Sequence, residues 1–306
     1  MKPITQAHSR RRWLPLVLFA PLLLAFQAPA LADARAPATA RTDHVAVQWR
    51  QTVERISLAP DTAGRAAAVG TALDALGLAW RSEAFEMQGR KGVNLFADLG
   101  GAADAPLLLI GAHYDRVDHG HGATDNASGV AAVLELARAF KARPLPGHRV
   151  RIAFWDLEEH GLLGSRAWVA APGQEQPALY VNFDVFGWGD TLWMMAPDPG
   201  HALLPPLRRA ASGAGVGLQA GPEYPPTDHR AFLQAGWPAV SFSLVGGQEI
   251  EGILDVFAGR SPARPPKVMQ VIHSERDVAA ELDAGFVPAA VGAIEEGLRA
   301  WDSGAR

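Results

Sequence analysis

The chain has 306 residues, of which 48% are hydrophobic and 20% are charged, and its formal net charge is −4. This composition is ordinary for a globular protein and is enough to build a sizeable core. There is no cysteine, which excludes disulfide bonds, a lipid-modified cysteine and thiolate metal ligands, so any metal must be bound by His, Asp and Glu. No basic run follows the N-terminal segment, so we expect no nucleic-acid partner.

The N-terminal segment predicts export. Residues 10–12 are arginines, residues 13–26 form an apolar run, and residues 30–32 supply small side chains for cleavage. The apolar run is short for a membrane span, so residues 1–32 are predicted to be a signal peptide rather than an uncleaved anchor. The segment also resembles a twin-arginine signal, and the ordinary secretory route fits it equally well.

Removal of this segment takes away one lysine and three arginines, which changes the net charge from −4 to −8. We therefore expect a periplasmic or secreted protein with no stable membrane span after the signal is removed. Residues 33–41 are predicted to be a flexible tail. Residues 42–306 are predicted to be a single catalytic domain, because no Pro/Ser-rich stretch interrupts their middle.

The sequence of residues 42–306 predicts alternating helices and strands. The sequence pattern predicts helices at residues 43–58, 62–76, 128–140, 203–211, 229–235 and 284–301, with Ser128 as an N-cap. It predicts strands at residues 79–87, 93–99, 106–112, 150–155, 178–185, 191–195 and 239–245. Residues 246–266 are predicted to be a loop or an insertion over the site. We therefore expect an α/β fold in which helices flank a mixed, mostly parallel sheet.

Three clusters place acidic or imidazole side chains at the ends of predicted elements. His113 lies in GAHYD at the end of a buried strand, and Asp125 lies in GATDNASG before a helix. Glu158 and Glu159 directly follow the strand VRIAFW. Ligands of α/β sheets bind beyond the carboxyl ends of the strands. Each cluster alone also fits a structural explanation: a strand-end histidine, a capping turn or a solvated acidic turn.

Two further positions extend the series. Asp184 lies in the apolar run ALYVNFDVFG, where a lone buried carboxylate is costly, so a ligand role explains it better than a buried strand does. His273 closes another apolar stretch and is equally well explained as a core histidine. The adjacent carboxylates of Glu158 and Glu159 repel each other, and a cation would relieve that repulsion.

In their order and spacing, GAHYD, GATDNASG, LEEHGLLGS, NFD and VIHSERD resemble the motifs of the bacterial leucyl aminopeptidase-type family of co-catalytic zinc peptidases. The resemblance runs from about residue 90 to the C-terminus and implies a zinc aminopeptidase (phosphorylase/hydrolase-like) fold. It also implies two Zn²⁺ per chain. His113 and Asp184 would bind one ion, Glu159 and His273 would bind the other, and Asp125 would bridge the two.

The resemblance also implies the catalytic roles. Glu158 would be the general acid/base for a water shared by the two metals, and Asp115 would orient His113. The peptide bond between Asp125 and Asn126 is expected to be cis. Oxygen and imidazole ligands fit zinc, although manganese and cobalt fit the same ligands.

The leading interpretation is an exported metallo-aminopeptidase that acts on peptides with a free N-terminus. The alternative is a glutaminyl-peptide cyclase with a single zinc, because cyclases also use an acid at the position of Asp228 in PTDHRAF. GATDNASG favours the peptidase. A non-catalytic scaffold domain is disfavoured, because all five ligand positions and Glu158 are intact.

Other side chains have two interpretations each. Asp228 and His229 are expected to contact substrate or brace the loop of His273, and Asp228 fits a helix N-cap equally well. His119 and His121 are expected to be loop residues or to contact the metal ligands from outside the ligand set. Three aromatic residues are candidates for a hydrophobic side-chain pocket or for the core: Trp155, Phe186 and Trp188.

Overall fold

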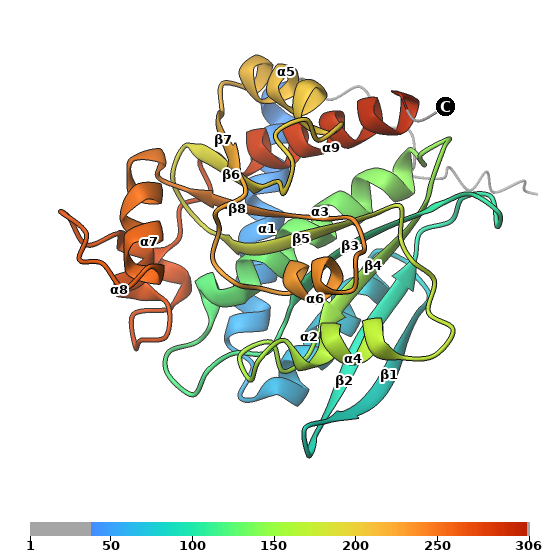
Figure 1. Cartoon of the computed structure of the whole chain (residues 1–306), viewed down its shortest axis with the longest axis horizontal. Helices are drawn as coiled ribbons and strands as arrows, with labels where there is room; N and C mark the ends of the chain where they lie inside the picture. Colours follow the sequence, from blue (N-terminus) through green and yellow to red (C-terminus); the bar gives the residue numbers. More distant parts are fainter. Residues whose placement is uncertain (1–37, 305–306) are drawn as a thin grey trace, which may run out of the picture. The chain divides into compact units, whose positions relative to one another are not determined.

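An eight-stranded mixed sheet forms the centre of the computed structural model, which describes residues 38–304 (Figure 1). The strands follow one another in the sheet in the order β1-β2-β4-β3-β5-β8-β6-β7. Their bounds are β1 Trp80–Met87, β2 Arg90–Asp98, β3 Leu107–His113, β4 Arg149–Trp155, β5 Leu179–Phe186, β6 Thr191–Met195, β7 Gly217–Gly221 and β8 Ala239–Val245.

The middle of the sheet is parallel. Strand β3 pairs in parallel with both β4 and β5, and β5 pairs in parallel with β8. Strand β2 is antiparallel to β4, and β6 is antiparallel to β8. All seven residues of β3 are buried, as expected for a continuous apolar strand covered on both faces. The predicted α/β fold with a mixed, mostly parallel sheet is confirmed.

Helices cover both faces of the sheet (Figure 1). On one face α3 packs on β3 and β5, and the helices packed beyond it include α1 and α9. On the other face α4 contacts β1 and β2, and α6 contacts β5 and β8. Figure 1 shows α7 and α8 together beyond one end of the sheet. The helices are α1 Ala38–Ser57, α2 Thr62–Ala75, α3 Ser128–Ala142, α4 Leu163–Ala170, α5 Leu204–Ala214, α6 His229–Gln234, α7 Ile250–Phe257, α8 Lys267–Val271 and α9 Val287–Gly304.

Two apolar clusters hold these layers together. The larger one joins α1, α3 and α9 to the sheet through residues such as Trp49, Leu136 and Ile294, all fully buried. The smaller one lies under α4 and α6, where Tyr180 stacks on Phe232 with ring centroids 3.8 Å apart. Because both faces are covered, the centre of the sheet is rigid enough to position side chains at its edge.

Several local expectations differ from the structure. Helix α1 begins at Ala38, so residues 38–41, expected in a flexible tail, are helical. Ser128 is the first residue of α3 rather than its N-cap, and its hydroxyl donates to the carbonyl of Thr124 at 2.6 Å. The predicted signal peptide at residues 1–32 lies outside the described residues. None of the described helices is long and apolar enough to cross a membrane.

Four elements were not predicted: α4, β7, α7 and α8. The helices α4, α7 and α8 have only eight, eight and five residues, which is too short for a clear period. The β7 sequence GLQAG has little strand propensity, and it pairs with β6 at the edge of the sheet. Residues 246–266, expected as a loop or insertion, contain α7.

Asp302 joins the C-terminal helix α9 to the loop before β4. Its carboxylate is fully buried and accepts a hydrogen bond from the amide N–H of Gly147 at 3.0 Å. The same oxygen pairs with His148 Nδ1 at 2.7 Å, and the His148 ring stacks on Trp301. This contact fixes the end of the helix that covers the larger core.

We expect Asp302→Ala to lower the free energy of unfolding by about 2 kcal/mol, because it leaves the buried donors of Gly147 and His148 without an acceptor. Urea denaturation followed by circular dichroism measures this change. The matched control is Ser303→Ala on the same helix, whose exposed hydroxyl bonds only to the carbonyl of Arg299. Equal stability of the two variants would contradict the role assigned to Asp302.

Candidate metal centre

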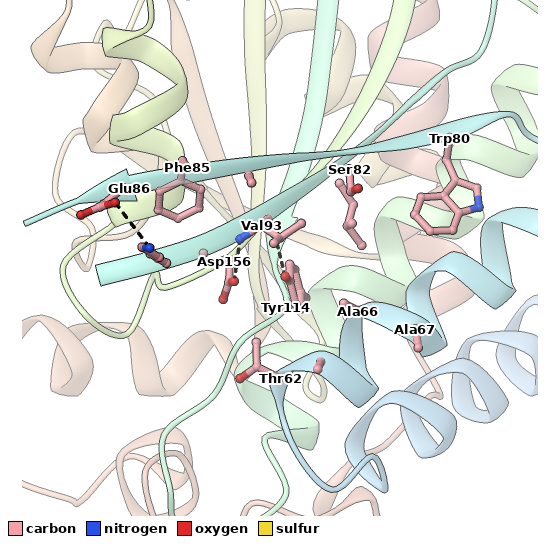
Figure 2. Close-up of a pocket in the computed structure, with 15 residues that line it drawn as sticks. Thr62, Ala66, Ala67, Trp80, Ser82, Phe85, Glu86, Val93, Tyr114 and Asp156 are labelled. Atoms are coloured by element: carbon pink, nitrogen blue, oxygen red, sulfur yellow. Dashed lines mark hydrogen bonds and ion pairs between the residues drawn. The ribbon is translucent and has the colours of Figure 1, made fainter. Parts of the chain in front are cut away.

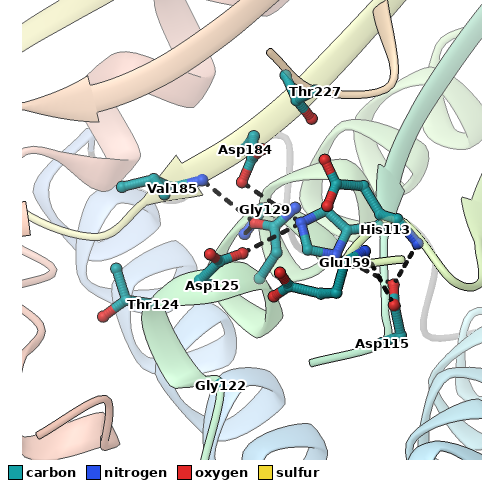
Figure 3. A network of polar contacts seen from close by, with 12 residues as sticks. His113, Asp115, Gly122, Thr124, Asp125, Gly129, Glu159, Asp184, Val185 and Thr227 are labelled. Carbon is teal, nitrogen blue, oxygen red and sulfur yellow. Dashed lines mark hydrogen bonds and ion pairs between the residues drawn. The ribbon is translucent and has the colours of Figure 1, made fainter. Parts of the chain in front are cut away.

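The polar clusters meet at the carboxyl ends of the central parallel strands (Figure 3). His113 ends β3, Glu158 and Glu159 follow β4, and Asp184 lies near the end of β5. Two other ligand candidates come from outside the sheet: Asp125 from the short helical turn η3 (Ala123–Ala127), and His273 from the segment after α8. The structure therefore brings all five predicted metal ligands and Glu158 to one place, as the topology of α/β sheets leads one to expect.

Irregular backbone aims these side chains. The pairing of β5 with β8 shifts register between Phe183 and Phe186, and Val185 there has a φ of 57°. A bulge of this kind redirects a side chain out of the strand pattern, which explains how Asp184 leaves an apolar strand. Leu157, directly before Glu158, and His273 itself also have positive φ values, of 57° and 56°. Such conformations cost about 1–3 kcal/mol each and cluster at functional sites.

The carboxylate of Asp125 lies between two imidazoles. Its Oδ1 is 3.1 Å from His113 Nε2, and its Oδ2 is 3.2 Å from His273 Nε2. Each imidazole has a second carboxylate beside the same nitrogen. Asp184 Oδ1 is 3.5 Å from His113 Nε2, and Glu159 Oε2 is 3.1 Å from His273 Nε2. The contacts thus form two adjoining sets of three ligands that share Asp125.

The unpaired atoms of this cluster fit a cation. Among the described residues, five buried atoms of these side chains have no hydrogen-bond partner: His113 Nδ1, His113 Nε2, Asp125 Oδ1, Glu159 Oε1 and Asp184 Oδ1. Buried polar atoms without partners are rare in proteins, and bound cations would satisfy those that face the cluster. Imidazole nitrogens and carboxylate oxygens are donors that zinc accepts.

Grouping the ligand atoms by their mutual distances alone gives a different division into two sets. The ligand atoms of His113, Asp125 and Glu159 lie within 4.8 Å of one another, and so do those of His113, Glu158 and Asp184. We prefer the division around Asp125, because it follows the direct approach of each carboxylate to an imidazole nitrogen. Glu158 makes no such approach to either histidine within 4.0 Å.

The closely spaced carboxylates of the site shift the pKa values of one another and of the histidines. Burial raises the pKa of Glu158 well above its usual value, and the neighbouring carboxylates of Asp228, Asp184 and Asp125 raise it further. Burial lowers the pKa of His113, but the surrounding carboxylates, Glu158 foremost, outweigh this and raise it well above its usual value. Hydrogen bonds to Asp125 and Glu159 raise the pKa of His273 to about 10. The site therefore favours bound positive charge.

Asp115 holds the groups around His113. It is almost fully buried, and its two oxygens accept hydrogen bonds from the amide N–H of Glu158 at 3.1 Å and of Glu159 at 3.2 Å. Its Oδ1 also lies 3.3 Å from His113 Nδ1, on the side of the ring opposite the metal cluster. One carboxylate thus touches both the β3 and the β4 sides of the site.

Asn126 fastens the Asp125 turn to β5. The peptide bond between Asp125 and Asn126 is cis, as expected from the resemblance. The Asn126 amide donates to the carbonyl of Phe183 at 2.9 Å, and its oxygen accepts from the amide N–H of Gly129 at 3.0 Å and of Val185 at 3.3 Å. A Cβ on Gly129 would lie only 2.3 Å from that oxygen, so this close approach requires glycine.

Asp277 holds the turn that carries Asp125, and the sequence analysis did not single it out. Its carboxylate accepts hydrogen bonds from the amide N–H of Thr124 at 2.6 Å and of Asp125 at 3.1 Å. Burial raises its pKa to about 6. Asp277 closes the motif VIHSERD, but a charged run of this kind does not reveal which acid is buried.

Asp228 lies beside the site without the cap role considered for it. It occupies the N-cap position of α6, yet its fully buried side chain makes no capping hydrogen bond and neither oxygen has a partner among the described residues. Burial raises the pKa of Asp228 to about 7 and lowers that of His229, also buried, to about 3. His119 and His121 are exposed loop residues, which is one of the two interpretations expected for them.

A cavity of about 240 Å³ opens beside the cluster and is lined by Asp125, Glu158 and His273 together with apolar side chains. The apolar walls come from β5, from β6, from residues 224–226, from β8, from α7 and from the segment of α8. Of the two interpretations of Trp155, Phe186 and Trp188, the core is confirmed, since all three are buried and line no part of this cavity. The aromatic residues that do line it are Trp193, Tyr224 and Phe257.

A larger hollow of about 730 Å³ lies between α2 and the hairpin of β1 and β2 (Figure 2). Tyr114 and Asp156 line it, but both are paired. The Tyr114 hydroxyl donates to the carbonyl of Val93 at 2.6 Å, and Asp156 accepts from the Val93 amide at 2.9 Å. None of its lining residues is a histidine, so the smaller cavity is the one that belongs to the metal centre.

Comparison with solved structures shows the fold. The glutaminyl cyclase of Porphyromonas gingivalis matches with a TM-score of 0.66 at 20% identity, over 83% of this chain and 97% of that one. BSAP, a zinc aminopeptidase from Bacillus subtilis, matches with a TM-score of 0.55 at 21% identity, over 69% of this chain and 50% of that one. At these identities the likeness concerns architecture alone, and it confirms the expected fold class.

Sequence comparison shows the family. Leupeptin-inactivating enzyme 1 of Streptomyces exfoliatus is 34% identical over 178 residues, which are 54% of this chain and 39% of that protein. This chain therefore matches well under half the length of that relative. The model of Peptidase family M28 matches residues 94–295, a span that includes all five candidate metal ligands and Glu158. The chain belongs to Peptidase family M28.

Proposed function

We propose that this protein is an exported aminopeptidase with two zinc ions that removes N-terminal residues from peptides. The observation that carries the proposal is the Asp125 carboxylate, whose two oxygens face two imidazoles at 3.1 and 3.2 Å. Membership of a peptidase family supports peptide-bond hydrolysis. The sequence of residues 1–32 supports export.

The residues divide into two sites. His113 and Asp184 would hold one ion, Glu159 and His273 the other, and Asp125 would bridge them. Paired zinc ions supply two things: a lowered pKa for the attacking water and stabilisation of charge on the attacking and leaving groups. Asp115 keeps the His113 ring in place from its other side, as partners of metal-bound histidines do.

Glu158 is the proton carrier of the proposed reaction. It lines the cavity beside Asp125, and its backbone N–H is held by Asp115. From this place its carboxylate would take the proton of the attacking water and pass it to the leaving amine. Its neighbour Glu159 projects toward His273 instead, so the adjacent acids have separate roles.

The cavity indicates the substrate class. Its apolar walls, which include Trp193, Ile253 and Phe257, lie directly against the metal cluster. An apolar N-terminal side chain would be buried there while its peptide bond reaches Glu158, and its free amine would lie among the carboxylates. We therefore propose that the enzyme prefers peptides that begin with an apolar residue.

We expect the mature protein to bind two zinc ions and to be stabilised by them. Zinc at a hundredfold excess over its dissociation constant adds about 2.7 kcal/mol to the free energy of unfolding for each site. Elemental analysis counts the ions, and calorimetry with and without EDTA measures the stabilisation. Asp125→Asn should weaken both sites. One zinc per chain, with cyclisation of an N-terminal glutamine peptide, would instead establish the cyclase.

We expect Glu158→Gln to lower kcat on leucine p-nitroanilide by about 10²- to 10⁴-fold, because the amide cannot carry the proton. The zinc content should stay at the wild-type value, since Glu158 is not a ligand. Glu175→Gln is the matched control, because that exposed carboxylate pairs only with Arg149. If Glu158→Gln remains active, the role of proton carrier is wrong.

We expect Phe257→Ala to lower kcat/KM on leucine p-nitroanilide by about tenfold and to leave hydrolysis of alanine p-nitroanilide nearly unchanged, because apolar contacts in such pockets are worth about 1–3 kcal/mol. Phe286→Ala is the control. Phe286 is similarly exposed, 40% against 49%, but lies outside the cavity. A parallel loss on both substrates would refute a pocket on α7.

A further inference from the structure

Arg65 is a buried cation in an alanine-rich helix. It lies on α2, between Gly64 and Ala66, and its side chain is fully buried. Its guanidinium donates to three backbone carbonyls, those of Tyr114, His121 and Gly122. The last two hydrogen bonds measure 2.9 and 3.1 Å. All the hydrogen bonds of this side chain therefore go to one segment of main chain.

That segment joins two of the candidate metal ligands. Tyr114 lies between His113 and Asp115, and Gly122 lies three residues before Asp125. Figure 3 shows Gly122 at the start of the turn that presents Asp125 beside His113. Because Arg65 bonds to both ends of the 114–122 loop, it sets how far apart those ends lie.

The loop depends on this support from outside. Gly122 adopts a φ of 56°, and a Cβ there would lie 2.7 Å from Arg116 Cβ and 2.8 Å from the carbonyl of Asp125, so the chain turns tightly at the point where Arg65 holds it. On the other side of the turn, the carbonyl of Asp277 accepts the N–H of His121 at 2.8 Å.

The charge of Arg65 is costly to bury, and hydrogen bonds offset that cost. Burial lowers its pKa to about 10, so the guanidinium stays protonated at neutral pH. Among the described residues it forms no ion pair within 4.0 Å, but it faces the negative charges of Asp115, Asp277 and Asp125. An apolar side chain could fill the same space without this desolvation cost but could not hold three carbonyls.

We propose that Arg65 is a positioning residue of the metal centre, which fixes the separation of His113 and Asp125 by holding both ends of the 114–122 loop. The proposal rests on the metal sites of the proposed function. It makes helix α2, which precedes the family-matched residues 94–295, a working part of the site.

The test compares Arg65→Met and Arg65→Lys with wild type in the purified mature protein. Zinc affinity is measured by competition with a chromophoric chelator, the ligand geometry by the visible spectrum of the cobalt-loaded protein, and the stability by thermal unfolding. The matched control is Arg299→Met, because Arg299 also donates to a carbonyl of another helix, that of Ala139, but lies outside the metal cluster.

We expect Arg65→Met to weaken zinc binding by about 10- to 100-fold and to change the cobalt spectrum, as loss of a group that orients ligands does. Arg65→Lys keeps the charge but not the planar set of N–H donors. Its zinc affinity should therefore lie between those of Arg65→Met and wild type. Arg299→Met should lose stability and keep wild-type zinc affinity.

Wild-type or tighter zinc binding in Arg65→Met overturns the proposal, because loss of a nearby cation without loss of ligand geometry can only favour zinc. If Arg65→Met does not fold, wild-type affinity and spectrum in Arg65→Lys overturn it equally. The activity of the wild-type protein tests the proposed function separately. Zinc binding without amide hydrolysis refutes the proposed function and leaves the role of Arg65 testable.

Discussion

The position of the Asp125 carboxylate is the constraint on which the site depends. Its two oxygens face the Nε2 atoms of His113 and His273, so a small rotation of this side chain would break both ligand sets. The surrounding structure opposes such a rotation. Asp277 accepts the N–H groups of the turn, and Asn126 ties the turn to β5.

The sheet brings together acidic side chains that repel one another. Parallel strands end at one edge, so His113, Glu158 and Asp184 converge there although they are far apart in sequence. The arrangement carries costs, since positive φ values occur at Leu157, Val185 and His273 and several buried polar atoms lack partners. The apolar cores on both faces of the sheet offset these costs. Structural strain at the site is therefore supported by packing elsewhere.

The fold by itself does not decide the reaction. A glutaminyl cyclase and a zinc aminopeptidase both share this architecture at about 20% identity. Function must be inferred from the site, where two sets of candidate ligands share one carboxylate and an apolar cavity adjoins them. The cavity walls on α7 and α8 come from the part of the chain that was hardest to interpret from its sequence. The proposed substrate preference therefore depends on elements that add little to the central sheet.

The sequence by itself determined the α/β class and nearly all the strands, and it named the candidate metal ligands that the structure brings together, because apolar runs and strand-end motifs are local signals. The ligand role of Asp184 was predicted from a local signal, because a carboxylate in an apolar strand is costly to bury without a partner. Only the tertiary structure decided which acids are paired. Asp277 and Arg65 act through hydrogen bonds to main chain distant in sequence, and Arg65 in an alanine-rich helix gives no sign of burial. The cavity depended on tertiary structure for the same reason, since its walls come from separate segments that no local period connects.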